Sequence, residues 1–359
     1  MSFIRLSDTL GWDNIKNAIT KTIAYNDTSL LYDVKYTINE YGQRITPDII
    51  PNDSMKSILF FGCSFTFGHG LNDKETMAYI VQDSVRDKYK VYNFSVIGFG
   101  ANQMLSAIKH NMLDGIVKYQ PRYIIFNTIA DHFRRIYSPH TPRYLFKDAN
   151  NKELVLTGLN DYINANSKHF FYKILNSEFI RYINTKSRDK KDIDLYIAIV
   201  LKSKKLLAQK YPNSQFHIIF WDNPSEAENN YIIERLKANN LETHVVSDIL
   251  PGYNTDDFRK YVIRYPFELH PNIYANHEVS KFILKNILLL KPSEYFRIKE
   301  KPFTDRFNNL NKAFWQINTI NFPENGCAML ESQVECKKSK LPSVADLDNF
   351  SFKPLLNEY

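Results

Sequence analysis

The chain has 359 residues and a formal net charge of +7, and 44% of its residues are apolar, which is enough for a well-packed core. This length fits two small domains or one α/β domain. The sequence contains no zinc finger, no RNA-binding signature and no base-reading basic helix, so a nucleic-acid partner is not expected. The densest basic patch, residues 186–191 (KSRDKK), is typical of a solvated loop.

The N-terminus and the hydropathy pattern argue against a secretory signal and a membrane span, and they leave export by another route open. The start MSFIRLSDTLGWDN lacks the apolar run and cleavage site of a secretory signal. No stretch of about 18 uninterrupted apolar residues occurs, so no membrane span is expected. We therefore predict a soluble, cytoplasmic protein. Cys327 and Cys336 could pair, but two nearby cysteines do not establish a disulfide framework.

The first part of the chain alternates apolar strands with helical segments. We expect a short helical lead-in over residues 1–29 and a strand over 31–46 that breaks at Gly42. Strand, helix, strand, helix and strand are then expected at 57–61, 75–88, 89–96, 102–119 and 122–129. This order implies right-handed crossovers and a parallel sheet covered on both faces.

The second part of the chain continues the pattern after an insertion. Residues 143–157 predict a hairpin that turns at 149–151. The helices expected after it lie at 177–184, 192–210 and 226–239, and the strands at 215–223 and 243–249. The segment after His270 is expected to form a last helix that runs to about Leu289.

The predicted fold is therefore a three-layer α/β sandwich around a mostly parallel sheet. Residues 1–290 are expected to form one domain, with a lead-in over 1–50. Residues 291–359 have weak periodicity and are expected to form an extension that packs on the domain.

Reactive residues follow several of the predicted strands. Ligands of open α/β sheets bind beyond the carboxyl ends of the strands. Ser64, Gly98 and the pair Asp131–His132 stand at such ends, and the run 268–272 (ELHPN) precedes the last helix. These four segments can build one site from distant parts of the chain.

Ser64 is the candidate nucleophile, and it needs a base because a serine hydroxyl is a poor nucleophile at neutral pH. His270 is the natural base, and Glu268 could accept a hydrogen bond from its other ring nitrogen. Asp248, Asp256 and Asp257 are alternative acids. The α/β-hydrolase elbow is excluded, since G-x-S-x-G would need glycine where Thr66 stands.

Four sequence blocks resemble the SGNH (GDSL-like) hydrolase superfamily. GCSFTFGHG is similar to block I, NFSVIG to block II and ELHPNIYANH to block V, while YTINEYGQR resembles the lead-in of a bacterial branch. The resemblance spans about residues 31–290 and implies a flavodoxin-like fold. It also implies an ester substrate, either a small molecule or an ester of a glycan or lipid, with Gly98 serving an oxyanion hole. No cofactor is implied.

The blocks also depart from the superfamily's pattern. Cys63 stands where block I usually has Asp, and Glu268 replaces the usual Asp before the histidine. Asp131 falls where block III usually has the Asn that donates to the oxyanion, with His132 after it. Asp131 could be protonated, His132 could donate instead, or the site could have drifted from efficient hydrolysis.

Simpler explanations exist for each of these residues. Ser64 could be an ordinary helix N-cap, Gly98 could only permit a tight turn, and Cys63 is interpreted as a small buried residue. The spacing of His69, His132 and His277 matches no standard ligand set, so no metal is expected. Three functions follow: an ester hydrolase, an acyltransferase to a glycan hydroxyl, or a non-catalytic binding protein on the same fold.

Overall fold

The computed structural model describes residues 3–26, 29–138, 140–146, 154–159, 178–224, 226–291 and 328–329. The protein forms two compact units, Met1–Thr22 with Val34–Lys299 and Ile23–Asp33 with Glu300–Tyr359. The first unit holds the candidate site. In the second, β14 (Ala328–Met329) pairs antiparallel with the end of β3 (Ile19–Asn26), and β3 lies beside β4 (Ser29–Thr37).

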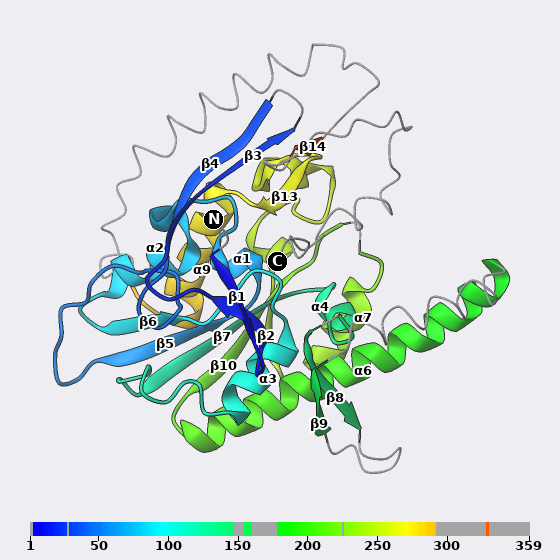
Figure 1. The fold of residues 1–359 in the computed structure, drawn as a ribbon, viewed down its shortest axis with the longest axis horizontal. Helices are drawn as coiled ribbons and strands as arrows, with labels where there is room; N and C mark the ends of the chain where they lie inside the picture. Colours follow the sequence, from blue (N-terminus) through cyan, green and yellow to red (C-terminus); the bar gives the residue numbers. More distant parts are fainter. Residues whose placement is uncertain are drawn as a thin grey trace. The chain divides into compact units, whose positions relative to one another are not determined.

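A five-stranded parallel sheet forms the centre of the first unit (Figure 1). Its strands, in spatial order, are β11 (Glu242–Val245), β10 (Gln215–Trp221), β7 (Pro121–Ile129), β5 (Lys56–Phe61) and β6 (Tyr89–Asn93). This is the doubly wound order of flavodoxin-like folds. The predicted α/β class and mostly parallel sheet are confirmed.

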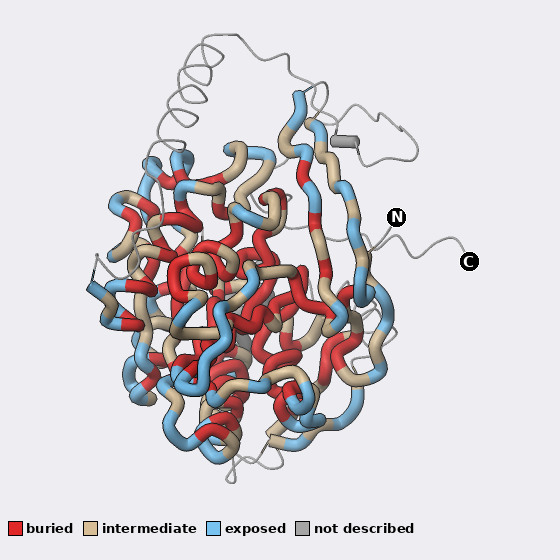
Figure 2. Tube along the Cα trace, turned by 90° about the vertical axis from the view of Figure 1, so that its left-hand side faces the viewer, coloured by how far each residue is buried: buried red, intermediate tan, exposed pale blue. Residues whose placement is uncertain are grey.

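Helices cover both faces of this sheet. The face of Leu59 and Phe61 packs against α3 (Ala101–Lys109), α6 (Glu178–Lys210) and α7 (Asn229–Ala238). The face of Ile58 and Phe60 packs against α2 (Met77–Val85), α8 (Val246–Ile249) and α9 (Ile273–Phe282). Alternate residues of β5 thus point into two separate cores, as a strand buried on both faces requires. Figure 2 shows the buried segments gathered in the interior.

The order in which successive strands join the sheet reverses beside β5. From β5 the chain crosses to β6 on one side, and β7 then returns to the other side of β5. The crevice at such a switch point is where open α/β sheets bind ligands. Ser64 begins α1 (Ser64–Phe67) directly beyond this strand, so the fold places the candidate nucleophile at the switch point.

The predicted helical lead-in over residues 1–29 was wrong. This segment forms β1 (Ile4–Ser7), β2 (Gly11–Asn14) and β3. Gly11 closes the β1–β2 hairpin in the left-handed region, with φ of +87°. The segment ITKTIAYN is rich in β-branched residues and contains a tyrosine, a composition that favours a strand.

Two helix predictions needed new boundaries. The expected helices at 177–184 and 192–210 are one continuous helix, α6. The helix expected over 102–119 ends at Lys109, because Asn111 takes a positive φ of 55° that breaks the helical path.

The inserted hairpin is confirmed as β8 (Pro142–Phe146) paired antiparallel with β9 (Leu154–Leu159). Its predicted turn, Cys327, Cys336 and nearly all of the predicted extension lie outside the described residues. The remaining short elements are η1 (Asp73–Glu75), α4 (His132–Arg135), η2 (Asp256–Tyr261), β12 (Val262–Arg264), β13 (Glu268–Pro271) and η3 (Ile283–Ile287).

The turn between β5 and α1 requires glycine at position 62. A Cβ atom there would lie 2.2 Å from Thr66 Oγ1 and 3.0 Å from the carbonyl oxygen of Asn127. We expect Gly62→Ala to reduce the free energy of unfolding by about 1–3 kcal/mol, the usual cost of overpacking. Urea denaturation measures this loss. In a Thr66→Ala background the same change should cost less, and an equal cost in both backgrounds would contradict the steric explanation.

Candidate active site

Ser64 lies at the amino end of a very short helix and is only 5% exposed. Gly68 ends this helix in the left-handed region, with φ of +80°, and donates its N–H to the carbonyl oxygen of Ser64. Glycine tolerates this backbone conformation without steric cost. The β5–α1 turn is thereby fixed at both ends.

Ser64, His270 and Glu268 form one chain of hydrogen bonds. His270 Nε2 lies 2.8 Å from Ser64 Oγ, although the two residues are 206 positions apart. His270 Nδ1 lies 2.5 Å from Glu268 Oε1, and the His270 backbone N–H donates to the same oxygen at 3.1 Å. Glu268 and His270 are two residues apart on β13, so both side chains leave the strand on the same side.

The environment keeps Glu268 ionised. Burial alone would raise the pKa of its carboxyl, but the charge and hydrogen bonds of His270 outweigh burial and lower that pKa to about 2. An ionised Glu268 accepts from Nδ1 of His270 and leaves Nε2 free to accept from the Ser64 hydroxyl. Among the described residues, the carboxylate bonded to His270 is that of Glu268, and none of the three alternative aspartates bonds to it.

His69 lies beside the three hydrogen-bonded residues Ser64, His270 and Glu268. The sequence did not predict this position. His69 Nε2 is 3.8 Å from Glu268 Oε2, and its ring centroid is 4.6 Å from that of His270. Burial, reinforced by the charge of His270, lowers the pKa of His69 to about 3. Glu268 therefore lies between two imidazoles, of which His69 stays neutral at pH 7.

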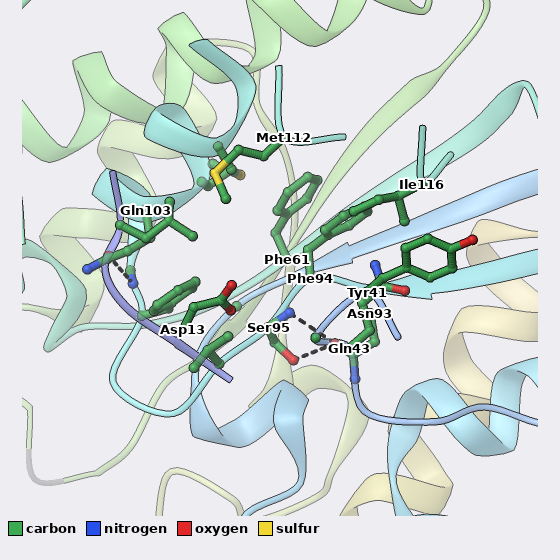
Figure 3. A pocket seen from close by; sticks show the side chains of 18 residues that line it. Asp13, Tyr41, Gln43, Phe61, Asn93, Phe94, Ser95, Gln103, Met112 and Ile116 are labelled. Carbon is green, nitrogen blue, oxygen red and sulfur yellow. Dashed lines mark hydrogen bonds between the residues drawn. The ribbon is translucent and has the colours of Figure 1, made fainter. Parts of the chain in front are cut away.

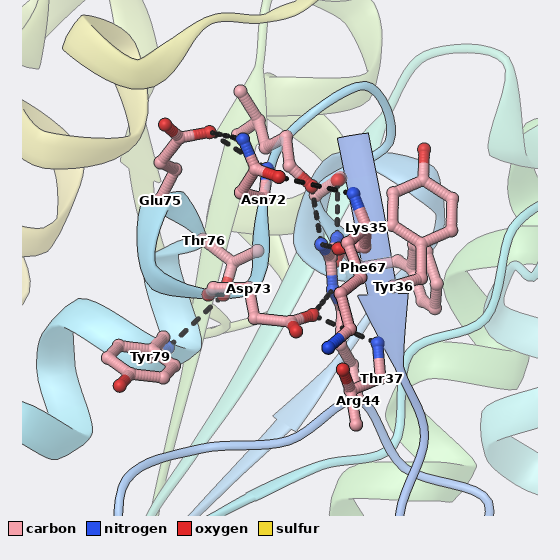
Figure 4. Close-up of polar contacts among 12 residues, drawn as sticks. Lys35, Tyr36, Thr37, Arg44, Phe67, Asn72, Asp73, Glu75, Thr76 and Tyr79 are labelled. Carbon is pink, nitrogen blue, oxygen red and sulfur yellow. Dashed lines mark hydrogen bonds and ion pairs between the residues drawn. The ribbon is translucent and has the colours of Figure 1, made fainter. Parts of the chain in front are cut away.

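Arg44 fixes the loop that contains His69 (Figure 4). Its guanidinium is 1% exposed and donates to the carbonyl oxygens of Phe67 at 2.8 Å, Gly68 at 2.6 Å and Leu71. It also pairs with Asp73 at 3.1 Å. Arg44 is the last residue of the YTINEYGQR block, so the sequence analysis had marked this segment. The sequence did not show which carbonyl oxygens Arg44 would bind.

Tyr36 begins the same block and reaches the same loop. Its hydroxyl accepts the N–H of Gly70 at 2.8 Å, and its ring lies 4.4 Å from the Arg44 guanidinium. The YTINEYGQR block thus holds the loop through the buried guanidinium of Arg44 and the buried phenol of Tyr36.

The Gly98 loop is held by the N-terminal hairpin. Gly98 has a φ of +82°, and the Trp12 indole N–H donates to the carbonyl oxygen of the preceding Ile97 at 2.8 Å. Trp12 also packs on Phe99, with ring centroids 5.9 Å apart. Among the described residues, neither the Ser64 nor the Gly98 N–H donates a turn or loop hydrogen bond, so both can donate to a ligand.

Asp131 and His132 make their contacts elsewhere. Asp131 Oδ2 accepts from Arg135 Nε at 2.6 Å, and the Asp131 side chain is 39% exposed. His132 is fully buried, with Nδ1 2.9 Å from Thr128 Oγ1. Burial lowers the pKa of His132 well below its usual range. This burial argues against direct contact between His132 and a substrate.

Arg135 connects the Asp131 segment to the Gly98 loop. Its guanidinium also donates to the carbonyl oxygen of Phe99 at 3.0 Å. Burial would lower the pKa of Arg135, but the charge of Asp131 outweighs burial and raises that pKa overall. Cys63 itself is a buried free thiol, in agreement with its interpretation as a packing residue.

A small cavity lies behind the Gly98 loop, between β5, β6 and α3 (Figure 3). Its volume is about 60 Å³, and Ser64 does not line it. Phe61, Phe94, Met112 and Ile116 form apolar walls, while Asp13 brings a carboxylate from β2. This space suits a few water molecules and is too small for a sugar ring.

The site offers one candidate metal cluster. Single ligand atoms of His69, Glu268 and His270 lie within 4.8 Å of one another. However, His270 already uses both ring nitrogens: Nε2 bonds to Ser64 Oγ, and Nδ1 bonds to Glu268 Oε1. Serine chemistry and metal binding would therefore compete for the same atoms.

Comparisons with known proteins give structural likenesses only. No protein-family model matches this sequence, and no curated protein matches it significantly. The psychrotrophic esterase EstA from Pseudoalteromonas sp. is 14% identical with a TM-score of 0.38, over 65% of this chain and 97% of its own. A GDSL-like lipase from Bacteroides thetaiotaomicron is 12% identical with a TM-score of 0.36, over 67% of this chain and 91% of its own.

An acetyl xylan esterase from Butyrivibrio proteoclasticus is 10% identical with a TM-score of 0.38, over 77% of this chain and 86% of its own. All three TM-scores are 0.38 or lower. Within the part of the chain that the structure describes, no helix has the length and apolarity needed to cross a membrane.

We expect Arg44→Met to destabilise the protein by about 3–5 kcal/mol, because it strips buried carbonyl oxygens and Asp73 of their donor. Arg44→Lys should recover only part of this loss, since an ammonium lacks the planar fork. The control is Arg86→Met, which breaks a half-exposed pair with Asp83 and should cost less than about 1 kcal/mol. Urea denaturation curves measure the free energy of unfolding of all three variants. Equal losses of stability for Arg44→Met and Arg86→Met would contradict the proposed role of Arg44 in fixing the loop.

His69 should make the protein acid-sensitive. Its folded pKa of about 3 lies below the ordinary 6.5, so between these values the unfolded chain binds more protons and stability falls as pH drops. We expect His69→Gln to reduce the slope of unfolding free energy against pH by up to about 1.4 kcal/mol per unit between pH 6 and 5. Glu268 titrates below this range, from its ordinary 4.5 towards about 2. Parallel slopes for the two proteins would contradict this assignment.

Proposed function

We propose that this protein is a serine ester hydrolase of SGNH type, acting through an acyl-serine intermediate. The single observation that supports this most strongly is the hydrogen-bonded chain from Ser64 Oγ through His270 to Glu268. Its distances are those required of a nucleophile, a base and an orienting acid.

In the first half-reaction, Ser64 Oγ attacks the ester carbonyl carbon while His270 Nε2 takes the hydroxyl proton. The carbonyl oxygen becomes an oxyanion, and the N–H groups of Ser64 and Gly98 are proposed to stabilise it. When the tetrahedral intermediate collapses, the bond to the alcohol oxygen breaks and His270 returns the proton to the leaving alcohol. Glu268 stabilises the transient imidazolium.

In the second half-reaction, water takes the place of the alcohol. His270 accepts a proton from this water, whose oxygen attacks the acyl carbon. When this second intermediate collapses, the bond from the acyl carbon to Ser64 Oγ breaks, His270 returns the proton to Oγ, and the carboxylic acid leaves. If a glycan hydroxyl replaced water at this step, the same residues would perform acyl transfer. A glycan acceptor that raises turnover above the rate in water alone would favour transfer.

A separate cleft lies near β12, and Ser64, His270 and Glu268 do not line it. The cleft has a volume of about 420 Å³, within the range of small-molecule sites. Pro224, which follows β10 at the carboxyl edge of the sheet, lines it together with Tyr265 and Arg259. The Arg259 guanidinium lies 4.8 Å from the Tyr265 ring centroid, so the wall combines an aromatic face with a cation. Such a wall suits a sugar ring or an anionic acyl group.

Asp131 favours a second candidate function, a non-catalytic binding protein on the same fold. The carboxylate pairs with Arg135 and cannot donate to an oxyanion. Removing one oxyanion donor typically costs about 100–1,000-fold in turnover. The positive charge of Arg135 balances the negative charge of Asp131 and so reduces the repulsion between Asp131 and an oxyanion.

Ser64→Ala should lower the kcat for hydrolysis of a short-chain aryl ester by about 10⁴-fold or more, because it removes the nucleophile. Ser95→Ala is a matched control, since this buried serine follows β6 and bonds to Asn93 rather than to His270. The initial rate of phenolate release measures both. Equal rates for wild type and Ser64→Ala would overturn the proposal.

A fluorophosphonate probe separates the two candidate functions. An activated serine attacks the probe and becomes labelled, so wild type should show one adduct by mass spectrometry and Ser64→Ala none. A folded wild-type protein that resists labelling would favour the binding protein. Circular dichroism checks that both proteins are folded.

A further inference from the structure

Away from Ser64, two histidines and a glutamate meet at the edge of the sheet. His217 lies on β10, and Glu242 and His244 lie on the edge strand β11. The parallel register pairs His217 with Glu242, and His244 stands two residues further along β11. Residues two apart on a strand share a face, so the three side chains lie on one face of the sheet.

The ligand atoms of these three side chains converge. His217 Nδ1 lies 3.2 Å from His244 Nε2, and with a carboxylate oxygen of Glu242 all three atoms lie within 4.8 Å of one another. At a Zn–N distance of about 2.0–2.1 Å, a tetrahedral ion holds two imidazole nitrogens about 3.3 Å apart. The separation of the two nitrogens matches this value, and it also permits a direct hydrogen bond between the rings.

Packing fixes the two rings in this arrangement. The His244 ring stacks against His217 at 5.4 Å and meets the Phe282 ring edge to face at 5.2 Å. Tyr123 flanks His217, with ring centroids 6.3 Å apart. Glu242 is exposed, which leaves an entrance for an ion and for a water ligand.

Both rings are in the protonation state that a metal needs. Burial, reinforced by the neighbouring His244, lowers the pKa of His217 to about 4. Burial also lowers the pKa of His244. Neutral imidazoles at pH 7 bind a metal without first releasing a proton.

We propose that His217, Glu242 and His244 bind one divalent transition-metal ion of the zinc class, with water as the fourth ligand. Imidazole nitrogen and carboxylate oxygen are a donor set that Zn²⁺ accepts. The ion fastens the edge strand β11 to β10 and so stabilises an edge that would otherwise be free to open. This role is independent of the proposed ester hydrolysis.

The test uses the full chain without a histidine tag, stripped with EDTA and titrated with Zn²⁺ alone by calorimetry at pH 7. We expect one site per chain and a rise in the midpoint of thermal unfolding that EDTA reverses. Glu242→Gln changes an exposed ligand without disturbing the core and should weaken Zn²⁺ binding at least about tenfold. His244→Phe keeps a ring against Phe282 and should abolish the site. Co²⁺ in place of Zn²⁺ should give visible bands typical of tetrahedral coordination.

His69→Gln is the matched control, because it removes a ligand from the other cluster, beside Ser64, and should leave the Zn²⁺ affinity unchanged. The proposal is overturned if wild type binds no Zn²⁺, which would mean that the two rings only share a hydrogen bond. It is equally overturned if Glu242→Gln and His244→Phe bind like wild type while His69→Gln does not, since the ion would then lie at the candidate active site.

Discussion

The buried positive charge of Arg44 is the constraint on which the candidate site depends. One planar guanidinium satisfies several carbonyl oxygens of the loop after α1 and pairs with Asp73. A buried cation is tolerated only when its donors are used and its charge is balanced, and both conditions hold here. The same loop places His69 beside Glu268. Arg44, which lies far from Glu268 in the sequence, therefore determines the surroundings of the candidate catalytic acid.

Charge is distributed unequally around the candidate nucleophile. At the base, an ionised Glu268 faces two imidazoles, which favours transient protonation of His270. At the proposed oxyanion hole, Asp131 is an acceptor where a donor is expected, and Arg135 offsets its charge. The nucleophile and base thus have the full set of contacts for acyl transfer, whereas the oxyanion side relies on backbone N–H groups. In the proposed ester hydrolysis, the missing side-chain donor would lower the rate of turnover.

Local periodicity predicted most elements of the central sheet, because strands buried on both faces are continuous apolar runs that differ clearly from their neighbours. It failed over residues 1–29, where the short strands of a two-stranded hairpin have little apolar contrast and the turn at Gly11 decides the structure. Histidine spacing along the chain also missed the His217–Glu242–His244 cluster. Its members come from two strands, and only the register of β10 on β11 brings them together.

The sequence by itself determined the α/β class, the strand that precedes Ser64 and the alternation of Glu268 and His270, because each depends on contacts between near neighbours in the chain. Only the tertiary structure decided that His270 reaches Ser64 across 206 positions, that Asp131 faces Arg135 and that His132 is buried. It also revealed the roles of Arg44 and His69. These outcomes depend on how strands and loops distant in sequence pack together, and residue spacing along the chain contains no measure of that packing.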